Sequence, residues 1–242
     1  MAVAFLTRLP VPGAALHGSA DIGLAAVFFP LVGAGLGALA GTLADLPHPR
    51  LAPSIVAVLV VATLALVTGA LHLDGLADTA DGMGGGRTRA DCLRIMKDHA
   101  IGSYGAVAIT LLLALKIVTL AALISAHTAL RALVVGGTLS RWTTLPLAAF
   151  LPCARPESGL GRVFAQHLRP RQVIAASVLT AAVVWLAAGW RGGLWWVAVA
   201  ALTLLAGLWF RRRLGGVTGD TLGAVVEICE VLVWLLVLLL PI

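Results

Sequence analysis

Long apolar runs recur along this chain, and they limit what it can fold into more than any other feature. Seven such runs, separated by short polar segments, lie at about 23–43, 52–72, 103–125, 129–150, 172–189, 193–210 and 221–241. A helix needs about 20 predominantly apolar residues to cross the hydrocarbon core of a bilayer. The runs therefore predict an all-α, polytopic membrane helix bundle with about seven transmembrane helices.

Little of the chain is left over for anything else. Of its 242 residues 60% are hydrophobic and 12% are charged, whereas about a quarter of the residues in a soluble domain are charged. We therefore expect residues 1–242 to form a single membrane-embedded domain. The three cysteines are scattered singly, so they predict neither a disulfide framework nor a zinc site.

The positive charges predict the orientation. With the N-terminus inside, the loops on that side carry 12 of the 17 Lys and Arg residues, and the opposite loops carry three. Cytoplasmic loops of membrane proteins hold such an excess. The N-terminus and the segment 72–102 are thus predicted to lie in the cytoplasm. The net charge of +6 resides in these loops, so we expect no nucleic-acid partner.

Three aspartates fall within eight residues at the end of the second apolar run. Asp74, Asp78 and Asp81 are spaced by four and three residues, which places them on one face of a helix. Carboxylates this close repel one another unless a cation neutralises them. Mg²⁺ takes one or two carboxylates and completes its shell with water and substrate phosphates. We predict that these three aspartates bind Mg²⁺.

The run "GMGGG" at 82–86 follows at once. Its glycines, Gly84 and Gly85 among them, are expected to end the helix and to let backbone N–H groups approach a bulky anion. Asp98 is a further candidate ligand or base. Positive charge for phosphate oxygens comes from basic residues nearby: Arg87, Arg89, Arg94 and Lys97. The segment 72–102 is therefore predicted to be a cytoplasmic catalytic segment for a metal-bound diphosphate; a solvated acidic loop is the alternative.

The last apolar run carries a second acidic set. In "GGVTGDTLGAVVEICE" the side chains of Asp220, Glu227 and Glu230 lie within about 80° on one helical face. Acids inside an apolar helix are expected to face the bundle interior and a partner. The metal site, Arg141 in "SRW" and bound substrate are the alternatives for that partner, and we predict substrate binding for all four residues. A purely structural ion pair is the competing interpretation.

Two weaker candidates complete the predicted substrate site. Arg8 belongs to the extended, proline-stiffened stretch "FLTRLPVP", which can lie along the inner surface or contact lipid headgroups. His72 lies two residues before Asp74, where it can support the metal ligands or merely pack.

These motifs together resemble the cobalamin synthase (adenosylcobinamide-GDP ribazoletransferase) family. The resemblance rests on "LHLDGLADTADGMGGG", "IMKDHAIGSYG", "SRW" and "GGVTGDTLGAVVEICE", with "FLTRLPVP" and "FFPLVGAGLG" upstream, and it covers residues 5 to about 231 in order. It implies a magnesium-dependent, membrane-bound enzyme. That enzyme would join adenosylcobinamide-GDP to alpha-ribazole or its 5′-phosphate and release GMP.

The resemblance also suggests roles for individual residues. Asp74, Asp78 and Asp81 would hold one or two Mg²⁺ ions on the diphosphate, and Lys97 or a nearby arginine would neutralise the leaving GMP. Asp98 or one of the three aspartates would take the acceptor proton. In "KDHAIG" the family often carries a serine and a basic residue after the aspartate, so the roles of His99 and Ala100 stay open, as does the oligomeric state, homo-oligomer included.

Two rival functions compete with this interpretation. A CDP-alcohol phosphatidyltransferase carries DxxDGxxAR, of which Asp78 to Gly82 match the first half, but Gly85 and Gly86 replace its Ala and Arg. A cation transporter predicts acids across the membrane midplane and an inverted repeat. The chain has no visible repeat, and its densest acids lie in the segment predicted to be cytoplasmic.

Overall fold

The computed structural model describes residues 1–11, 19–46, 51–155 and 168–241. In chain order the helices are α1 (Ala2–Leu6), α2 (Ser19–Ala26), α3 (Phe29–Asp45), α4 (Pro53–Thr68), α5 (Leu71–Gly85), α6 (Arg89–Ile95), α7 (Ser103–Ser125), α8 (Ala129–Trp142), α9 (Thr144–Phe150), α11 (Pro170–Leu214) and α12 (Gly219–Leu239). The only β-pairing within these ranges is a single bridge between Cys153 and Val217. The predicted all-α class is confirmed.

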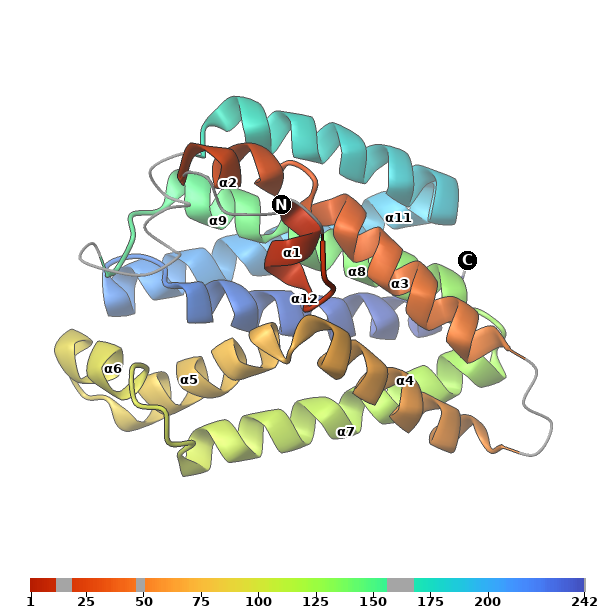
Figure 1. Ribbon diagram of the computed structural model, residues 1–242, viewed down its shortest axis with the longest axis horizontal. Coiled ribbons are helices and arrows are strands. Elements are labelled where there is room, and N and C mark those ends of the chain that lie inside the picture. The colour runs from red at the N-terminus through yellow and green to blue at the C-terminus, as the bar shows by residue number, and fades with distance from the viewer. Residues whose placement is uncertain (12–18, 47–50, 156–167, 242) are drawn as a thin grey trace.

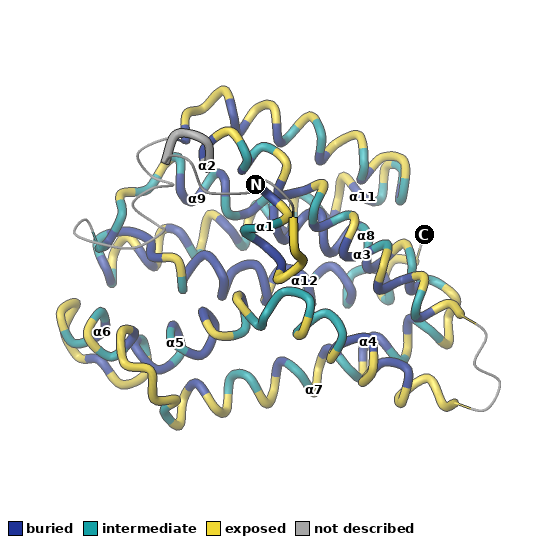
Figure 2. Tube along the Cα trace, in the orientation of Figure 1, coloured by how far each residue is buried: buried dark blue, intermediate teal, exposed yellow. Residues whose placement is uncertain are grey.

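Helix α12 runs through the middle of the bundle (Figure 1). Helices α4, α5 and α7 lie on one side of it, and α8, α9 and α11 lie on the other, with α3 packed against α8. In the most apolar stretch of α12, 67% of the residues are buried, against 22% in α7. Figure 2 shows this contrast between a buried central helix and a peripheral one. The acids of α12 are therefore carried into the core of the bundle.

Helices α3 and α8 touch backbone to backbone. A Cβ atom at Gly33 would collide with the carbonyl oxygen of Gly137, and one at Gly37 would collide with that of Leu133. At Gly41 it would lie 2.6 Å from the Cα atom of Leu130. Small residues at four-residue spacing allow such an approach between membrane helices. This contact holds α8, and with it Arg141, in a fixed place beside α12.

A sharp bend separates α4 from α5. The two helices meet at 89° across Gly69 and Ala70, which both have positive φ, 63° and 57°. Glycine adopts that conformation freely, whereas alanine is strained there. The chain after α1 covers the bend: the Arg8 N–H donates to the Val67 carbonyl at 2.8 Å, and the Arg8 side chain fills the space beside Gly69. The bend redirects α5 so that its first turns face the start of α12.

The predicted spans agree with the structure only in part. By length and composition, three described helices can cross a membrane, namely α7, α11 and α12; the bent pair α4 and α5 makes a fourth if it forms one broken span. Two predicted spans, 172–189 and 193–210, fall inside α11, which is interrupted at Gly189 and doubles back on itself (Figure 1). The predicted span 129–150 is divided between α8 and α9. A multi-pass helical membrane protein fits these helices, while the number of seven spans and the cytoplasmic N-terminus stay predictions.

Candidate active site

The three aspartates of α5 share one helical face but not one environment. Asp74 is exposed, Asp78 is half-buried and Asp81 is buried, at 7% exposure. The burial increases along the helix because the C-terminal half of α5 packs against α6 and the start of α7. The predicted helical register is therefore confirmed, while the three carboxylates are not equivalent.

Asp220 joins the first two of these aspartates. It lies in the first turn of α12, where the positive end of a helix favours an acidic side chain. A Cβ atom on Gly75 would lie 2.8 Å from the Asp220 carbonyl oxygen, so α5 and α12 touch between Asp74 and Asp78. Asp78 interacts electrostatically with both Asp220 and Asp74. Two helices that are distant in sequence thus form one acidic cluster, which we define as Asp74, Asp78 and Asp220.

One arginine partly neutralises this acidic cluster. The Arg155 Nη1 atom lies 2.9 Å from the Asp220 Oδ2 atom, and its Nη2 atom donates to the Leu93 carbonyl at 3.3 Å. Arg155 also interacts favourably with Asp78. Its Nε atom is buried and has no hydrogen-bond partner in the described part of the chain. From the sequence, topology was the favoured explanation of Arg155 and contact with an anionic substrate the weaker alternative, because a basic residue after an apolar run needs no further role.

The carboxylate of Asp81 is hydrogen-bonded to α7. Its Oδ2 atom accepts the Gly102 N–H at 2.7 Å, and its Oδ1 atom accepts the Gly105 N–H at 2.8 Å. Both carboxylate oxygens are therefore hydrogen-bonded to the first turn of α7. Asp81 still interacts with Asp78, more weakly than Asp220 and Asp74 do, but its two oxygens are used by α7, which neither spacing nor composition could reveal.

Helix α5 ends inside the glycine run, as predicted, with Gly86 as its C-cap residue. The helix continues to Gly85, and its N–H groups there are used within the helix. The missing side chains instead admit neighbouring groups: a Cβ atom on Gly84 would lie 2.6 Å from the Tyr104 ring, and a Cβ on Gly86 would lie 2.6 Å from the Cys92 Sγ atom. Gly85 is exposed, with only Ile95 near its Cβ position. A substrate contact at Gly84 or Gly85 stays a prediction.

The other predicted residues of the 72–102 segment lie on its surface. Arg87, Lys97 and Asp98 are exposed, and so is Arg94, which pairs weakly with Asp91 at 4.0 Å. Asp98 accepts the Ala100 N–H at 3.1 Å. Within the described residues, no hydrogen bond or ion pair joins these side chains, or Arg8, to the acidic cluster. Their contacts with substrate stay predictions.

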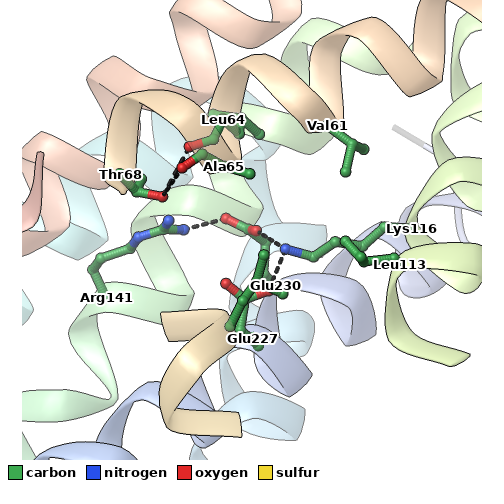
Figure 3. Close-up of a pocket in the computed structure, with 10 residues that line it drawn as sticks. Val61, Leu64, Ala65, Thr68, Leu113, Lys116, Arg141, Glu227 and Glu230 are labelled. Carbon is green, nitrogen blue, oxygen red and sulfur yellow. Dashed lines mark hydrogen bonds and ion pairs between the residues drawn. The ribbon is translucent and has the colours of Figure 1, made fainter. Parts of the chain in front are cut away.

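The two glutamates of α12 form a second cluster, buried and fully paired (Figure 3). The Lys116 Nζ atom lies 2.5 Å from Glu227 and 2.7 Å from Glu230, and Arg141 pairs with the other oxygen of Glu230. We call Lys116, Arg141, Glu227 and Glu230 the charge network. Two positive and two negative side chains make it neutral overall. Arg141 was one of the predicted partners, whereas Lys116 is 111 residues from Glu227 in sequence and was missed.

The charge network lines a small pocket. The other walls come from α4, α5 and α7 and are apolar apart from the Thr68 hydroxyl: Val61, Leu64, Ala65, Thr68, Leu73 and Leu113. His72 is buried against α12, where a Cβ on Gly223 would lie 3.2 Å from the His72 Cα atom, and it interacts electrostatically with Arg141 and Glu230. His72 therefore adjoins the charge network, two residues before the first aspartate.

The donor set of the acidic cluster suits a hard divalent cation. No three His, Cys, Asp or Glu side chains in the described ranges are arranged to enclose an ion by themselves. Mg²⁺ does not require this, because water and phosphate oxygens fill most of its shell. Asp74 and Asp78 offer oxygens beside Asp220, and their mutual repulsion favours a cation. Asp81 fits less well because both of its oxygens already accept hydrogen bonds.

Comparison with known proteins identifies relatives over nearly the whole chain. The family described as cobalamin-5-phosphate synthase matches residues 1–238. A Rhizobium etli (strain CIAT 652) protein is 40% identical over 242 residues, covering 95% of this chain and 92% of the relative. A Syntrophobacter fumaroxidans protein is 41% identical over 239 residues, covering 96% and 94%. Both bear the name adenosylcobinamide-GDP ribazoletransferase. No solved structure matches the chain.

Proposed function

This chain belongs to the cobalamin-5-phosphate synthase family, and we infer from that premise that it is a transferase of cobalamin synthesis. It transfers the adenosylcobinamide phosphate moiety from adenosylcobinamide-GDP to alpha-ribazole or its 5′-phosphate, with release of GMP. The observation that supports a site for this reaction is the acidic cluster with Arg155 at the contact of α5 and α12. We place this site at the cytoplasmic face of the inner membrane, where the excess of Lys and Arg puts the 72–102 segment.

The donor is an anionic diphosphate ester, and the acceptor is anionic too when it is the 5′-phosphate, so the site has to bind and neutralise negative charge. Asp74, Asp78 and Asp220 would hold Mg²⁺, which when bound neutralises the diphosphate and stabilises charge on the attacked phosphorus. Arg155 has a planar guanidinium whose donors match phosphate oxygens. Its Nε–H is unpartnered, and its bond to Asp220 can be exchanged for one to substrate. Arg155 would therefore bind and orient the diphosphate next to the carboxylates.

Two residues of the α6–α7 connection complete the proposal. Lys97 is exposed and would face the leaving GMP. Asp98 is also exposed, with only the Oδ1 atom used in its bond to Ala100, so its second oxygen is available to take the acceptor hydroxyl proton. We assign that proton to Asp98 because the carboxylates of the acidic cluster would be committed to the cation.

Release of GMP by the purified protein tests the proposal. With adenosylcobinamide-GDP, alpha-ribazole and Mg²⁺, the wild-type protein should release GMP. Asp78→Asn should reduce that release about 100- to 1,000-fold, the usual effect of removing one electrostatic group from a reacting centre. The size of the loss should shrink as Mg²⁺ is raised, because a weakened site is refilled at higher concentration.

Asp91→Asn provides the matched control. Asp91 lies on the same segment but is only partly exposed, and it caps α6 with Thr88; hydrogen bonds from the Thr88 side chain and backbone lower its pKa. Its asparagine variant should retain activity within about twofold. Equal activity of the Asp78 and Asp91 variants would reject the metal assignment, and absence of GMP release from the wild-type protein with either acceptor would reject the reaction itself.

A further inference from the structure

The first turn of α7 is capped by a residue from another helix. Helix α7 begins at Ser103, and its N-cap residue Gly102 supplies no side-chain hydrogen bond. The first N–H groups of a helix have no partner within the helix. Here the N–H groups of Gly102 and Gly105 donate to the two oxygens of Asp81, 21 and 24 residues earlier in the chain. These are the two N–H groups that a local cap with a capping box would satisfy.

The residues at positions 102 and 105 leave room for this carboxylate. A Cβ atom on Gly102 would lie 2.8 Å from the Asp81 Cγ atom, and one on Gly105 would collide with the Asp81 Oδ2 atom. The Gly105 position would also lie 2.9 Å from the Ala77 carbonyl oxygen. Alanine at either position would therefore displace the Asp81 carboxylate. Asp81, Gly102 and Gly105 form one structural unit that ties α7 to α5.

The same unit closes one end of the α6–α7 connection. At the other end, Met96 packs against Gly82, where a Cβ atom would lie 3.0 Å from the Met96 sulfur. The connection, residues 97–101, is thus held on α5 at two consecutive residues, Asp81 and Gly82. Between these anchors lie Lys97 and Asp98, both exposed.

We propose that Asp81 is a positioning residue: it caps α7 from α5 and thereby holds Lys97 and Asp98 in place, and it does not ligate the metal. The α7 N-terminus supplies the positive partial charge that this buried carboxylate needs. No Lys or Arg side chain of the described residues forms an ion pair with it, in contrast to Asp220. The role of Lys97 in this inference rests on the proposed function, whereas the cap itself does not.

Hydrogen exchange tests the cap without any variant. In wild-type protein the Gly102 and Gly105 amides should exchange at least tenfold more slowly than the Ile101 amide, and saturating Mg²⁺ should leave their exchange unchanged. In Asp81→Asn and in Gly105→Ala these two amides should exchange at least tenfold faster. Unchanged exchange in both variants, or a Mg²⁺-dependent change at these amides in wild type, would overturn the proposal.

Kinetics of the folded protein test the positioning role. Asp81→Asn should lower kcat about tenfold, with the KM for adenosylcobinamide-GDP and the Mg²⁺ concentration for half-maximal rate unchanged within twofold. Adding Asp81→Asn to the double variant Lys97→Ala, Asp98→Ala should cost no further activity, because a residue that acts only by positioning these two has no effect once both are removed. A rise of more than threefold in the Mg²⁺ requirement, or additive losses, would instead mark Asp81 as an independent ligand or catalytic group.

Discussion

Two groups of acids lie along the same face of α12, and they have opposite surroundings. The charge network is buried, and Glu227 and Glu230 are both paired with Lys116, while Arg141 takes a second oxygen of Glu230. The acidic cluster, two to three turns away around Asp220, has three carboxylates and one arginine. The first group is electrically complete without any ligand, and the second is not.

The difference shows where a charged ligand can bind. A neutral network gains little from another ion even though the Arg141 Nε atom has no hydrogen-bond partner among the described residues, and breaking the network leaves a charge in the apolar interior. Three carboxylates that share a single arginine still attract a further cation. Once bound, that cation would attract phosphate. We therefore expect substitutions in the charge network to lower stability and substitutions around the acidic cluster to lower catalytic activity.

Lys116→Met should give the largest loss, and it should be a loss of stability. The variant leaves Glu227 and one oxygen of Glu230 unpaired in the bundle interior, at a cost of about 3–5 kcal/mol in the free energy of unfolding. Denaturation of the purified protein in detergent, followed by tryptophan fluorescence, measures this. Adding Glu227→Gln should recover part of the loss, and a stable Lys116→Met protein would contradict the structural role of the charge network.

Arg155→Gln should affect turnover and leave stability nearly unchanged. Charge-assisted hydrogen bonds contribute about 1.5–3 kcal/mol, so GMP release should fall roughly 10- to 100-fold. Arg155→Lys keeps the charge but loses the fork of donors, and it should recover only part of the rate. If the unfolding midpoint drops as far as it does in Lys116→Met while the rate of the folded protein is normal, Arg155 belongs with the structural residues.

Thr218→Ala should have the smallest effect. The Thr218 hydroxyl accepts the Thr221 N–H at 3.2 Å and caps α12 just before Asp220. Loss of such a cap costs about 1 kcal/mol. We expect a small drop in the unfolding midpoint and a change of activity below threefold; Thr218→Ser, which keeps the hydroxyl, should restore the midpoint. A larger loss of activity would mean that the first turn of α12 takes part in binding.

Sequence alone was sufficient where a feature depends on neighbours along the chain. The apolar run at 103–125 coincides with α7 (Ser103–Ser125), because a uniform hydrophobic stretch has few alternative boundaries. The four-residue spacing of Gly33, Gly37 and Gly41 can also be read from the sequence, whereas only the structure supplies α8 as their partner. The helical register of Asp74, Asp78 and Asp81 was likewise predictable.

Features set by distant residues could not be predicted in this way. Asp220 and Arg155 are 65 residues apart, and nothing local distinguishes Arg155 from the other loop arginines. The glycines after Asp81 end α5 as the sequence predicted, but only the structure shows that Tyr104, Met96 and Cys92 occupy the space that these glycines leave.

The charge network also constrains how the protein enters its membrane. An unpaired acid at the centre of a spanning helix costs about 2.5–3.5 kcal/mol on insertion scales, and α12 carries two. Their partners come from α7 and α8, which are synthesised before it. Both partner helices are therefore already made when α12 emerges, and pairing with them would offset this cost as α12 inserts.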